Sequence, residues 1–521
     1  MSPLNARSPQ PISSDILLML FALAVGIFLS HTYHLPLGAP LILLPSSLIL
    51  IVISLKLHGN LNHLGIASKL LKAGIISCFF SLGILTESLN RPIISFPPTD
   101  SEGNFYGEVL KVKTKATGDM IIMEYLTPEC SKTGIKGYMR LSSGQIQAGD
   151  IIRCRGQLSR VNDPTNRMND GFRRYLLSIG ITTIAKCKPN DVSIIGYKSS
   201  PAILAQHIRT NLEIGIENSG LKKPTVSFLV TVLLGDKSFL DPTAAQTFSD
   251  AGVSHVLALS GMHIGIIVFI LMTLLFPLNF TGNYRLRYYV TFILLWAYAF
   301  ISGFSETIVR ATLMTSFSFI AMLLQRKNSS FNALCLACLL ILVVSPEALF
   351  SISLQLSFLC VAAIIIFSEP MNPINMADHP YLYKFFGLIT TSLIATFATW
   401  ILTAYFFSSL PLLFLPANII ILPLLPLYLS VAIIYLILHS IGIQFDFLAT
   451  LIDSSYSGLL SLLNLISAHG EAVVRISPSL ISVCLWLAGI TVLAISVNTT
   501  RRRKFLILSS TFILCLSICL I

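Results

Sequence analysis

The sequence predicts a polytopic α-helical membrane protein of about 11–13 transmembrane helices, with a small β-barrel domain inserted after the third helix. The 521-residue chain is 54% hydrophobic and only 11% charged, with a mean hydropathy of +0.78. Soluble proteins carry about 25% charged residues, so this composition excludes an ordinary soluble domain. Long apolar runs recur along the chain, and one polar stretch of short alternating runs separates the third from the rest.

Three hydrophobic runs open the chain, near residues 15–33, 37–55 and 68–88. Each approaches the roughly 20 residues that a helix needs to cross the hydrocarbon layer. The loop between the second and third runs carries Lys56, Lys69 and Lys72. Cytoplasmic loops are enriched in Lys and Arg, so this loop is expected in the cytoplasm and the third run is expected to end outside.

The segment that follows, over about 90–200, is therefore expected to be extracytoplasmic. It contains five short runs typical of β-strands, at 105–115, 119–126, 134–141, 150–158 and 180–187. Gly107, Gly137 and Gly156 stand where the strands are expected to bend. A turn and a helical piece at 161–180 precede the fifth run, and five strands with a helix before the last fit an OB-like barrel.

Amphipathic helices are expected over 201–250, where the segments are too charged or too short to span a membrane and would suit its outer interface. Residues 251–521 are expected to form a transmembrane channel domain. Its apolar runs lie near 254–278, 288–302, 307–325, 331–345, 353–368, 385–407, 411–426, 427–441, 478–498 and 505–521.

Basic loop residues support this count of crossings. They follow the first, third and ninth of the ten runs and are Arg285, Arg287, Arg326, Lys327, Arg501, Arg502, Arg503 and Lys504. If each run crosses once, all of them are cytoplasmic, and thirteen crossings in total place the C-terminus outside. Prolines within 411–441 could break or re-enter these helices, and 447–470 could lie flat on the membrane.

Polar residues interrupt the first run of the channel domain, in the stretch GVSHVLALSGMHIGIIVFIL that starts at Gly252. Ser260 lacks the spacing of a nucleophile elbow, and no acidic residue lies within this run to complete a metal site with His255 and His263. The histidines could meet only if the Ser260-Gly261 pair bends the helix. These groups are expected to line a pore or to face other helices, and composition does not choose between the two.

Three further polar clusters enter apolar runs. Glu306 and Arg310 are one helical turn apart, in the order that favours an ion pair, which a helix-end salt bridge would also explain. Gln355 and Ser357 enter the run at 353–368, and Asn418 lies between prolines. Four polar interruptions in one helical bundle favour a permeation pathway over an enzyme pocket.

The ten cysteines give no metal or cofactor signature. Cys335 and Cys338 have C-x-x-C spacing but lie in an apolar run, where two small side chains are expected to pack. Cys130, Cys154 and Cys187 lie in the polar segment. Two of these three could form a disulfide in an oxidising compartment, and the sequence leaves the pairing open.

At this point the motifs resemble those of the ComEC-type competence proteins, the inner-membrane channels for DNA uptake in natural transformation. The first motif spans residues Leu233, Leu234, Gly235, Asp236, Gly252, His255, Ala258, Ser260, Gly261, His263 and Gly265. The others match through Gly303, Ser305, Arg310, Ala311, Pro346, Leu349, Gln355, Leu356, Ser357, Phe358, Asn418 and Pro423. The resemblance covers about 90–500 and implies a channel rather than an enzyme.

Two positions depart from that pattern: Glu306 replaces an expected small residue or proline, and Ser345 replaces an expected acid or amide. Long family members also carry a C-terminal metallo-β-lactamase-like domain, and no H-x-H-x-D-H motif occurs here. The resemblance then implies a short form that needs a separate nuclease. Its other implied partners are single-stranded DNA, a DNA receptor, cytoplasmic DNA-translocating or processing proteins, and the bacterial inner-membrane bilayer.

The basic charge of the polar segment is compatible with DNA binding. Residues 91–223 contain 19 Lys+Arg against 12 Asp+Glu, a net charge of +7. The candidate phosphate-binding residues, which a generic solvated face would also explain, are Lys111, Lys113, Lys115, Arg153, Arg155 and Arg160. A transporter or flippase for another anionic polymer or lipid, or an intramembrane hydrolase that uses Ser260 and His255, are the alternatives to a DNA channel.

Overall fold

The computed structural model describes residues 14–36, 38–58, 64–90, 102–113, 119–126, 132–141, 146–161, 163, 173, 176, 181–236, 240–281, 284–324, 330–371, 379–408, 410–411, 413–467, 473–474, 476–498 and 503–519. The chain forms two compact units. The helical unit comprises Met1–Leu89, Glu217–Ala299 and Ser305–Ile521, and the barrel unit comprises Asn90–Ile216 and Phe300–Phe304.

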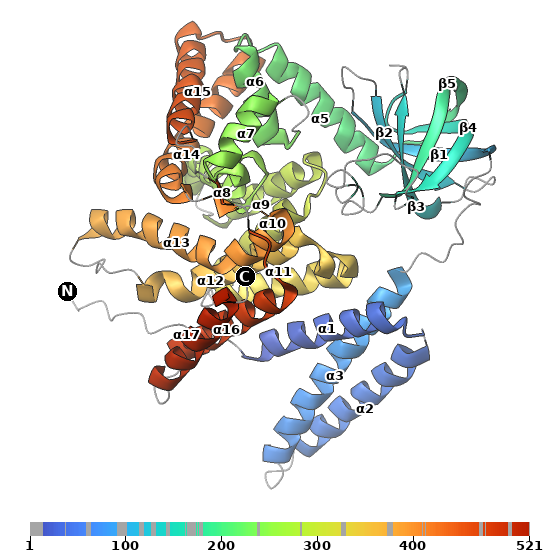
Figure 1. The fold of residues 1–521 in the computed structure, drawn as a ribbon, viewed down its shortest axis with the longest axis vertical. Coiled ribbons are helices and arrows are strands. Elements are labelled where there is room, and N and C mark those ends of the chain that lie inside the picture. The colour runs from blue at the N-terminus through green and yellow to red at the C-terminus, as the bar shows by residue number, and fades with distance from the viewer. Residues whose placement is uncertain are drawn as a thin grey trace. The chain divides into compact units, whose positions relative to one another are not determined.

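The helical unit begins with three long helices, in agreement with the three predicted apolar runs. These are α1 (Ser14–Tyr33), α2 (Gly38–His58) and α3 (Leu64–Asn90) (Figure 1). Helices α1 and α3 approach closely where Gly26 and Gly83 face the opposing backbone. Nearby, His31 Nδ1 lies 2.9 Å from Glu87 Oε1, which joins the same two helices by a polar contact.

The rest of the helical unit is a succession of helices and short helical turns (Figure 1). The elements before residue 302 are α6 (Lys223–Leu229), η2 (Val230–Leu234), α7 (Pro242–Asp250), η4 (Ser254–Leu257), α8 (Gly261–Leu274), η5 (Phe276–Thr281) and α9 (Tyr284–Ile301). After them come α10 (Glu306–Leu323), α11 (Ser330–Val344), η6 (Pro346–Phe350), α12 (Ile352–Met371), α13 (Pro380–Phe407), α14 (Phe414–Ser440), α15 (Asp446–Ser467), α16 (Leu480–Asn498) and α17 (Arg503–Cys519).

Apolar clusters pack the described helices against one another, and two of these clusters are large. In the first, Leu23 and Ile27 of α1 pack with Cys335 and Leu342 of α11 and with Leu354 of α12. The second surrounds Trp486 of α16, which is 2% exposed, and joins α16 to α12, α13 and α17. Its indole Nε1 donates a hydrogen bond of 3.2 Å to the carbonyl oxygen of Phe397. The predicted packing role of Cys335 and Cys338 agrees with their burial in the first cluster.

Four helices among the described residues are long and apolar enough to cross a membrane: Asp15–Tyr33, Ile66–Asn90, Pro380–Phe407 and Phe414–Ser440. Eight more apolar helical segments are shorter, at 10–17 residues. The protein is therefore mostly helical, with four candidate membrane spans by length and composition.

In the helical unit, the structure differs from the predicted element boundaries over 254–278 and over 411–441. The run near 254–278 is not one helix, because η4 ends at Leu257 and α8 begins only at Gly261. The runs at 411–426 and 427–441 are instead one helix, α14, which contains Pro423 and Pro426. Proline is tolerated inside membrane helices where neighbouring groups satisfy the freed backbone, so the prolines alone gave a wrong boundary.

The barrel unit confirms the five predicted strands. They are β1 (Glu102–Lys113), β2 (Asp119–Leu126), β3 (Lys132–Leu141), β4 (Asp150–Arg160) and β5 (Ile181–Tyr197), and α5 (Pro201–Glu217) follows them. The strands close into a barrel in the order β1-β2-β3-β5-β4. Among the described barrel strands, β3 and β5 pair in parallel and the other pairs are antiparallel. The predicted helical piece at 161–180 lies largely outside the described residues.

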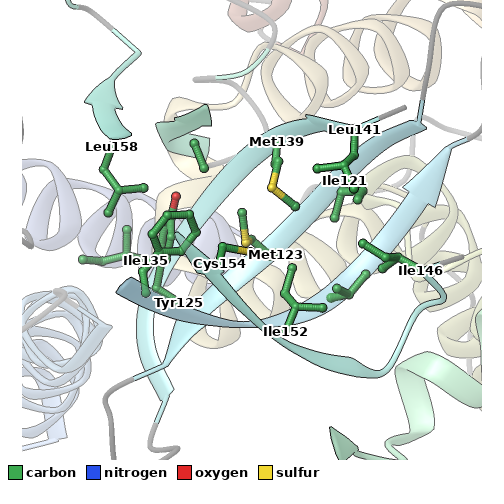
Figure 2. Close-up of a cluster of buried hydrophobic side chains, with 13 residues drawn as sticks. Ile121, Met123, Tyr125, Ile135, Met139, Leu141, Ile146, Ile152, Cys154 and Leu158 are labelled. Carbon is green, nitrogen blue, oxygen red and sulfur yellow. The ribbon is translucent and has the colours of Figure 1, made fainter. Parts of the chain in front are cut away.

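Alternating side chains of the strands fill the barrel, as Figure 2 shows. Ile121, Met123 and Tyr125 of β2 are buried beside Met139 of β3 and Ile152 of β4. Strand β5 extends ten residues beyond the predicted 180–187 run to Tyr197, and its second half pairs with β4 through Asp150↔Tyr197. That half is mostly exposed, so it lacks the alternation on which the sequence prediction depended.

Candidate functional site

The motif residues of the apolar run near 254–278 lie where the helix is interrupted. Gly252 adopts a left-handed conformation with φ +78°, and the 3₁₀ turn η4 follows it. The chain is then extended at Ala258 and again at Ser260, which is the N-cap residue of α8. His255 and His263 therefore lie on two separate elements, and their imidazoles are close enough to interact electrostatically.

Ser260 and His263 form a capping box at the start of α8. The backbone N–H of Ser260 donates a hydrogen bond of 3.1 Å to His263 Nδ1, and the Ser260 hydroxyl lies 3.0 Å from the same nitrogen. Because Nδ1 accepts a bond from the backbone, its neutral imidazole carries the proton on Nε2. The predicted bend at Ser260-Gly261 is therefore a helix start that these two side chains define.

This arrangement does not resemble a nucleophile and its base. The single lone pair of His263 Nδ1 already faces the Ser260 backbone N–H, and an activated serine needs a base oriented by a third group. His263 is 2% exposed, and its Nε2 has no hydrogen-bond partner among the described residues. A buried N–H donor without an acceptor costs free energy, so Nε2 of His263 is a candidate hydrogen-bond donor to a ligand.

The Leu233–Asp236 motif packs against this helix start. Gly235 ends the π-helical turn η2 with φ +74°, a conformation that favours glycine. A Cβ atom on Gly235 would lie 2.5 Å from Leu259 Cδ1, just before Ser260. The Thr231 hydroxyl closes the turn by donating a 3.0 Å hydrogen bond to the carbonyl oxygen of Asp236.

A third motif segment reaches the same place from α10. Ser305 precedes α10, and Thr307 Oγ1 donates a 2.7 Å hydrogen bond to the carbonyl oxygen of Leu259. A Cβ on Gly261 would come within 3.7 Å of Ala311 Cβ, so α8 and α10 approach at small residues. Three motif segments that are distant in sequence thus converge on Leu259 and its neighbours.

Arg310 lies one turn further along α10 and is 4% exposed. Its guanidinium lies near the thiols of Cys338 of α11 and Cys360 of α12. The cation therefore lies in the interior of the helix bundle. The side chain of Glu306 lies outside the described residues, so the predicted Glu306–Arg310 pair stays a prediction.

The remaining motif residues have separate positions. Gln355 Nε2 donates a 3.0 Å hydrogen bond to the carbonyl oxygen of Leu349, which fixes the turn η6 to α12, and Ser357 is half-buried on α12. Asn418 of α14 is 7% exposed, and its Oδ1 has no hydrogen-bond partner among the described residues. Helix α14 contacts α8, whereas Gly265 of α8 has no neighbour within 4 Å of its Cβ position.

The candidate DNA-binding cations of the barrel include residues of strands β1 and β4, and the side chains of those on β4 are described. Arg153, Arg155 and Arg160 of β4 are exposed, and Arg153 pairs in register with Tyr106 of β1. Lys111 and Lys113 belong to β1, but their side chains, like all of Lys115, lie outside the described residues. The exposed arginines alternate with the buried Ile152 and Cys154, so the predicted strand pattern holds for β4.

Cys154 and Cys187 are free thiols on the paired strands β4 and β5, and their side chains share a hydrogen bond. This bond lowers the pKa of Cys187 from its ordinary value and, together with burial, raises that of Cys154. Cys130 lies outside the described residues. Of the three cysteines considered for a disulfide, these two therefore lie together.

Two features escaped the sequence reasoning. The Ser-x-x-His spacing of Ser260 and His263 is that of a capping box, with His in place of the usual Glu or Gln, and could have been recognised. The contact of Thr307 with Leu259 O had no signal in the sequence. Among the described residues, no group of three or more His, Cys, Asp or Glu side chains could hold a metal ion.

Comparison with known proteins identifies one matching family and two curated relatives. A family model described as "Competence protein" matches residues 232–500, more than half of the chain. The chain is 25% identical over 369 residues to "ComE operon protein 3" of Bacillus subtilis (strain 168), which covers 67% of this chain and 44% of that protein. It is 26% identical over 222 residues to "Recombination protein 2" of Haemophilus influenzae, which covers 40% of this chain and 27% of that protein.

The matches thus span less than half the length of these curated relatives. The matched family region includes the helix start at Ser260, the buried Arg310 and Asn418. No solved structure matches the chain.

Proposed function

Because the chain belongs to the competence protein family, we propose that it is an inner-membrane channel that passes single-stranded DNA into the cytoplasm during DNA uptake. The observation that carries this proposal is the convergence of three motif segments on Leu259, at the start of α8. The buried polar groups of His263, Arg310 and Asn418 belong to α8, α10 and α14 of the same unit.

The buried polar groups include a cation and neutral hydrogen-bond donors, which can both interact with the phosphates of a DNA strand. DNA phosphates lose solvation when the strand leaves water, and cations and hydrogen-bond donors offset that loss. Arg310 supplies a buried cation, and the Nε2 proton of His263 supplies a donor. His255, Ser260, Gly303, Ser305, Gln355 and Ser357 are proposed to shape the path or the turns around it, with Gly261 and Gly265 leaving space beside α8.

The proposed topology follows from the helix lengths and from the basic residues of the loops before α13, because the single helix α14 removes one of the predicted crossings after it. Residues 1–89 form three transmembrane helices, 90–200 an extracytoplasmic OB-like domain, 201–250 interfacial helices, and 251–521 the channel domain. Four described helices are long enough to span by themselves, and the shorter apolar helices would complete a total of about 11–13 crossings. The closed five-stranded barrel supports the OB-like assignment.

The barrel is proposed to receive DNA before it reaches the membrane. Arg153, Arg155 and Arg160 present exposed cations, and Tyr106 adds an aromatic ring beside Arg153. Cations and aromatic rings together are typical of surfaces that bind single strands without sequence preference. The proposed partners are a DNA receptor outside, and DNA-translocating or processing proteins, including a nuclease.

The test replaces Arg310 in the chromosomal gene and measures import of labelled DNA into the cytoplasm. Arg310→Gln is expected to reduce import at least tenfold, because the path loses its buried cation, while Arg310→Lys keeps part of it. The amounts of both variants in the membrane fraction are measured by immunoblot. Normal import by a stably inserted Arg310→Gln protein would overturn the strand path, and normal transformation after gene deletion would overturn the function.

The alternatives predict different outcomes. A flippase or transporter for another anionic polymer would leave DNA import intact after gene deletion. A hydrolase would require the Ser260 hydroxyl, so a Ser260→Ala variant that imports DNA normally excludes nucleophilic catalysis. The orientation of His263 Nδ1 toward the Ser260 backbone already favours the structural role.

A further inference from the structure

A cavity of about 480 Å³ lies between α12, α13 and α14 of the helical unit. This volume is in the range of small-molecule sites, which are about 300–1,000 Å³. Its lining combines a cation, hydroxyl groups and apolar surface, from Ser368, Tyr383, Lys384, Leu388, Thr391 and Leu422. None of these residues belongs to the proposed strand path.

Two hydroxyl groups in this cavity are available to a ligand. Some hydroxyls of α13 and α14 bond the carbonyl oxygen four residues earlier, as Thr399 does at 2.8 Å and Ser430 at 2.7 Å, whereas Ser392 Oγ of α13 has no partner among the described residues. Within the described part of the chain, neither Ser368 nor Thr391 has such an intramolecular hydrogen bond. Both therefore line the cavity with unused hydrogen-bonding capacity.

Lys384 supplies the charge. No described carboxylate lies within ion-pair distance of its ammonium group, and its side chain is exposed. A cation with two free hydroxyls is suited to a phosphate group, whose oxygens accept several hydrogen bonds. The adjoining Leu388 and Leu422 give the same cavity an apolar wall.

The positions of the lining residues along α13 indicate where such a phosphate would come from. Helix α13 has 28 residues and is about 42 Å long, whereas the hydrocarbon core is about 30 Å thick. A helix of this length that crosses the bilayer upright would extend into the headgroup region. Its first turns carry Tyr381, Tyr383 and Lys384, and tyrosine and lysine are enriched at that level of the membrane.

We propose that this cavity binds the phosphate of an anionic phospholipid from the cytoplasmic leaflet. Lys384 pairs with the phosphate, Ser368 and Thr391 donate hydrogen bonds to it, and Leu388 and Leu422 contact the upper acyl chain. The proposed topology places the start of α13 at the cytoplasmic face, where anionic lipids are concentrated. The site depends on this membrane placement and not on DNA transport.

A passing DNA strand is a poorer fit to the same residues. Single-stranded DNA channels need a succession of cations and aromatic stacking surfaces along the backbone. This cavity offers one ammonium group beside an apolar wall, which matches one headgroup attached to acyl chains. The lipid is therefore the occupant that the lining favours.

The test uses the full-length protein in nonionic detergent and counts bound lipid by native mass spectrometry. Phosphatidylglycerol is expected to bind at least fivefold more tightly than phosphatidylcholine, and Lys384→Gln to weaken phosphatidylglycerol about tenfold because a charge-assisted contact is lost. Lys69→Gln is the matched control, since Lys69 is an exposed cation of α3 at the same proposed face and does not line the cavity. Thr391→Val keeps the charge and the side-chain size and should weaken binding severalfold.

Four outcomes would overturn the proposal. The two lipids could bind equally, or Lys384→Gln could behave as Lys69→Gln does. Inorganic phosphate could occupy the site and displace phosphatidylglycerol, which would indicate a free-anion site. Finally, Lys384→Gln could weaken binding of a thymidine oligonucleotide but not of phosphatidylglycerol, which would assign the cavity to DNA. If Lys384→Gln fails to fold, an unchanged affinity in Thr391→Val overturns the proposal.

Discussion

His263 combines a helix-capping acceptor and a buried hydrogen-bond donor in one side chain. Its Nδ1 accepts the Ser260 N–H and so defines where α8 begins, while its Nε2 is buried without a partner among the described residues. The sequence showed that a break at Ser260-Gly261 was needed for the two histidines to meet. It did not show which nitrogen would hold the break, because that depends on the rotamer and the local backbone.

The two roles of His263 can be separated by substitution. Asparagine places an acceptor oxygen near the position of Nδ1 but lacks the Nε2 donor, whereas leucine lacks both. His263→Asn is expected to unfold like the wild-type protein, and His263→Leu to lose about 1 kcal/mol of stability with the cap. Both should reduce DNA import if the Nε2 donor contacts the strand. Thermal unfolding in detergent and import assays provide the measurements. Full import by His263→Asn would show that His263 only caps the helix and does not contact the strand.

The Cys154–Cys187 contact makes a prediction about pH and oxidation. The pKa of Cys187 is lowered by the hydrogen bond from Cys154, so its thiolate persists at lower pH than that of an ordinary cysteine. Iodoacetamide should therefore label Cys187 before Cys154 in the reduced protein, with a rate that falls as pH decreases through the lowered pKa. Mass spectrometry of peptides identifies the labelled residue, and faster labelling of Cys154 would contradict the assignment.

In an oxidising compartment the same two thiols are predicted to form a disulfide. Closing the loop between β4 and β5 should stabilise the barrel unit by about 3–4 kcal/mol. Unfolding in denaturant with and without a reducing agent measures this difference. Cys187→Ser serves as the control, because its stability should not respond to the reducing agent.

At the scale of elements, prediction succeeded where one physical signal dominated. The helices α1 to α3 are long, mainly apolar runs, and β2 alternates buried and half-buried side chains over residues 121–125, so their positions were predicted within a few residues. Prediction failed over 254–278 and 411–441. In the first, hydropathy continues across a capped break, and in the second, Pro423 and Pro426 stay within α14.

The hydropathy pattern also did not predict the close packing between α1 and α3. A Cβ atom on Gly83 would lie 2.3 Å from the carbonyl oxygen of Leu23, and one on Gly26 would lie 2.2 Å from that of Phe80. Small residues allow membrane helices to approach in this way. The two glycines therefore determine how near the helices can come.

Gly83→Ala is expected to destabilise the α1–α3 pair by about 1–3 kcal/mol, since a backbone carbonyl must move to admit the methyl group. Gly458→Ala in α15 is the matched control, because its Cβ position has no neighbour within 4 Å. That variant should be neutral or gain up to about 1 kcal/mol from helix propensity. Thermal unfolding of both proteins in the same detergent makes the comparison, and equal melting temperatures would refute the packing argument.

At the scale of the whole molecule, composition indicated a membrane protein and the motifs indicated its family, but neither specified a path for DNA. The proposed path depends on the positions of buried polar atoms, and these are a property of tertiary contacts. The net charge of the polar segment, +7 over residues 91–223, is a long-range quantity that the sequence does specify. Its consequence for DNA binding can be tested without knowledge of the path.

Binding of single-stranded DNA to the full-length protein should weaken steeply with salt if exposed arginines of β4 contact phosphates. Each neutralised phosphate contributes about 0.7 to the slope of log K against log salt concentration for single strands. The double variant Arg153→Gln/Arg155→Gln is therefore expected to reduce the magnitude of that slope by about 1.4. Lys69→Gln, which removes an exposed cation of α3, should leave it unchanged. Fluorescence anisotropy with a labelled oligonucleotide over a range of salt concentrations measures the slope, and equal slopes for the double variant and the wild-type protein would remove these arginines from the DNA-binding surface.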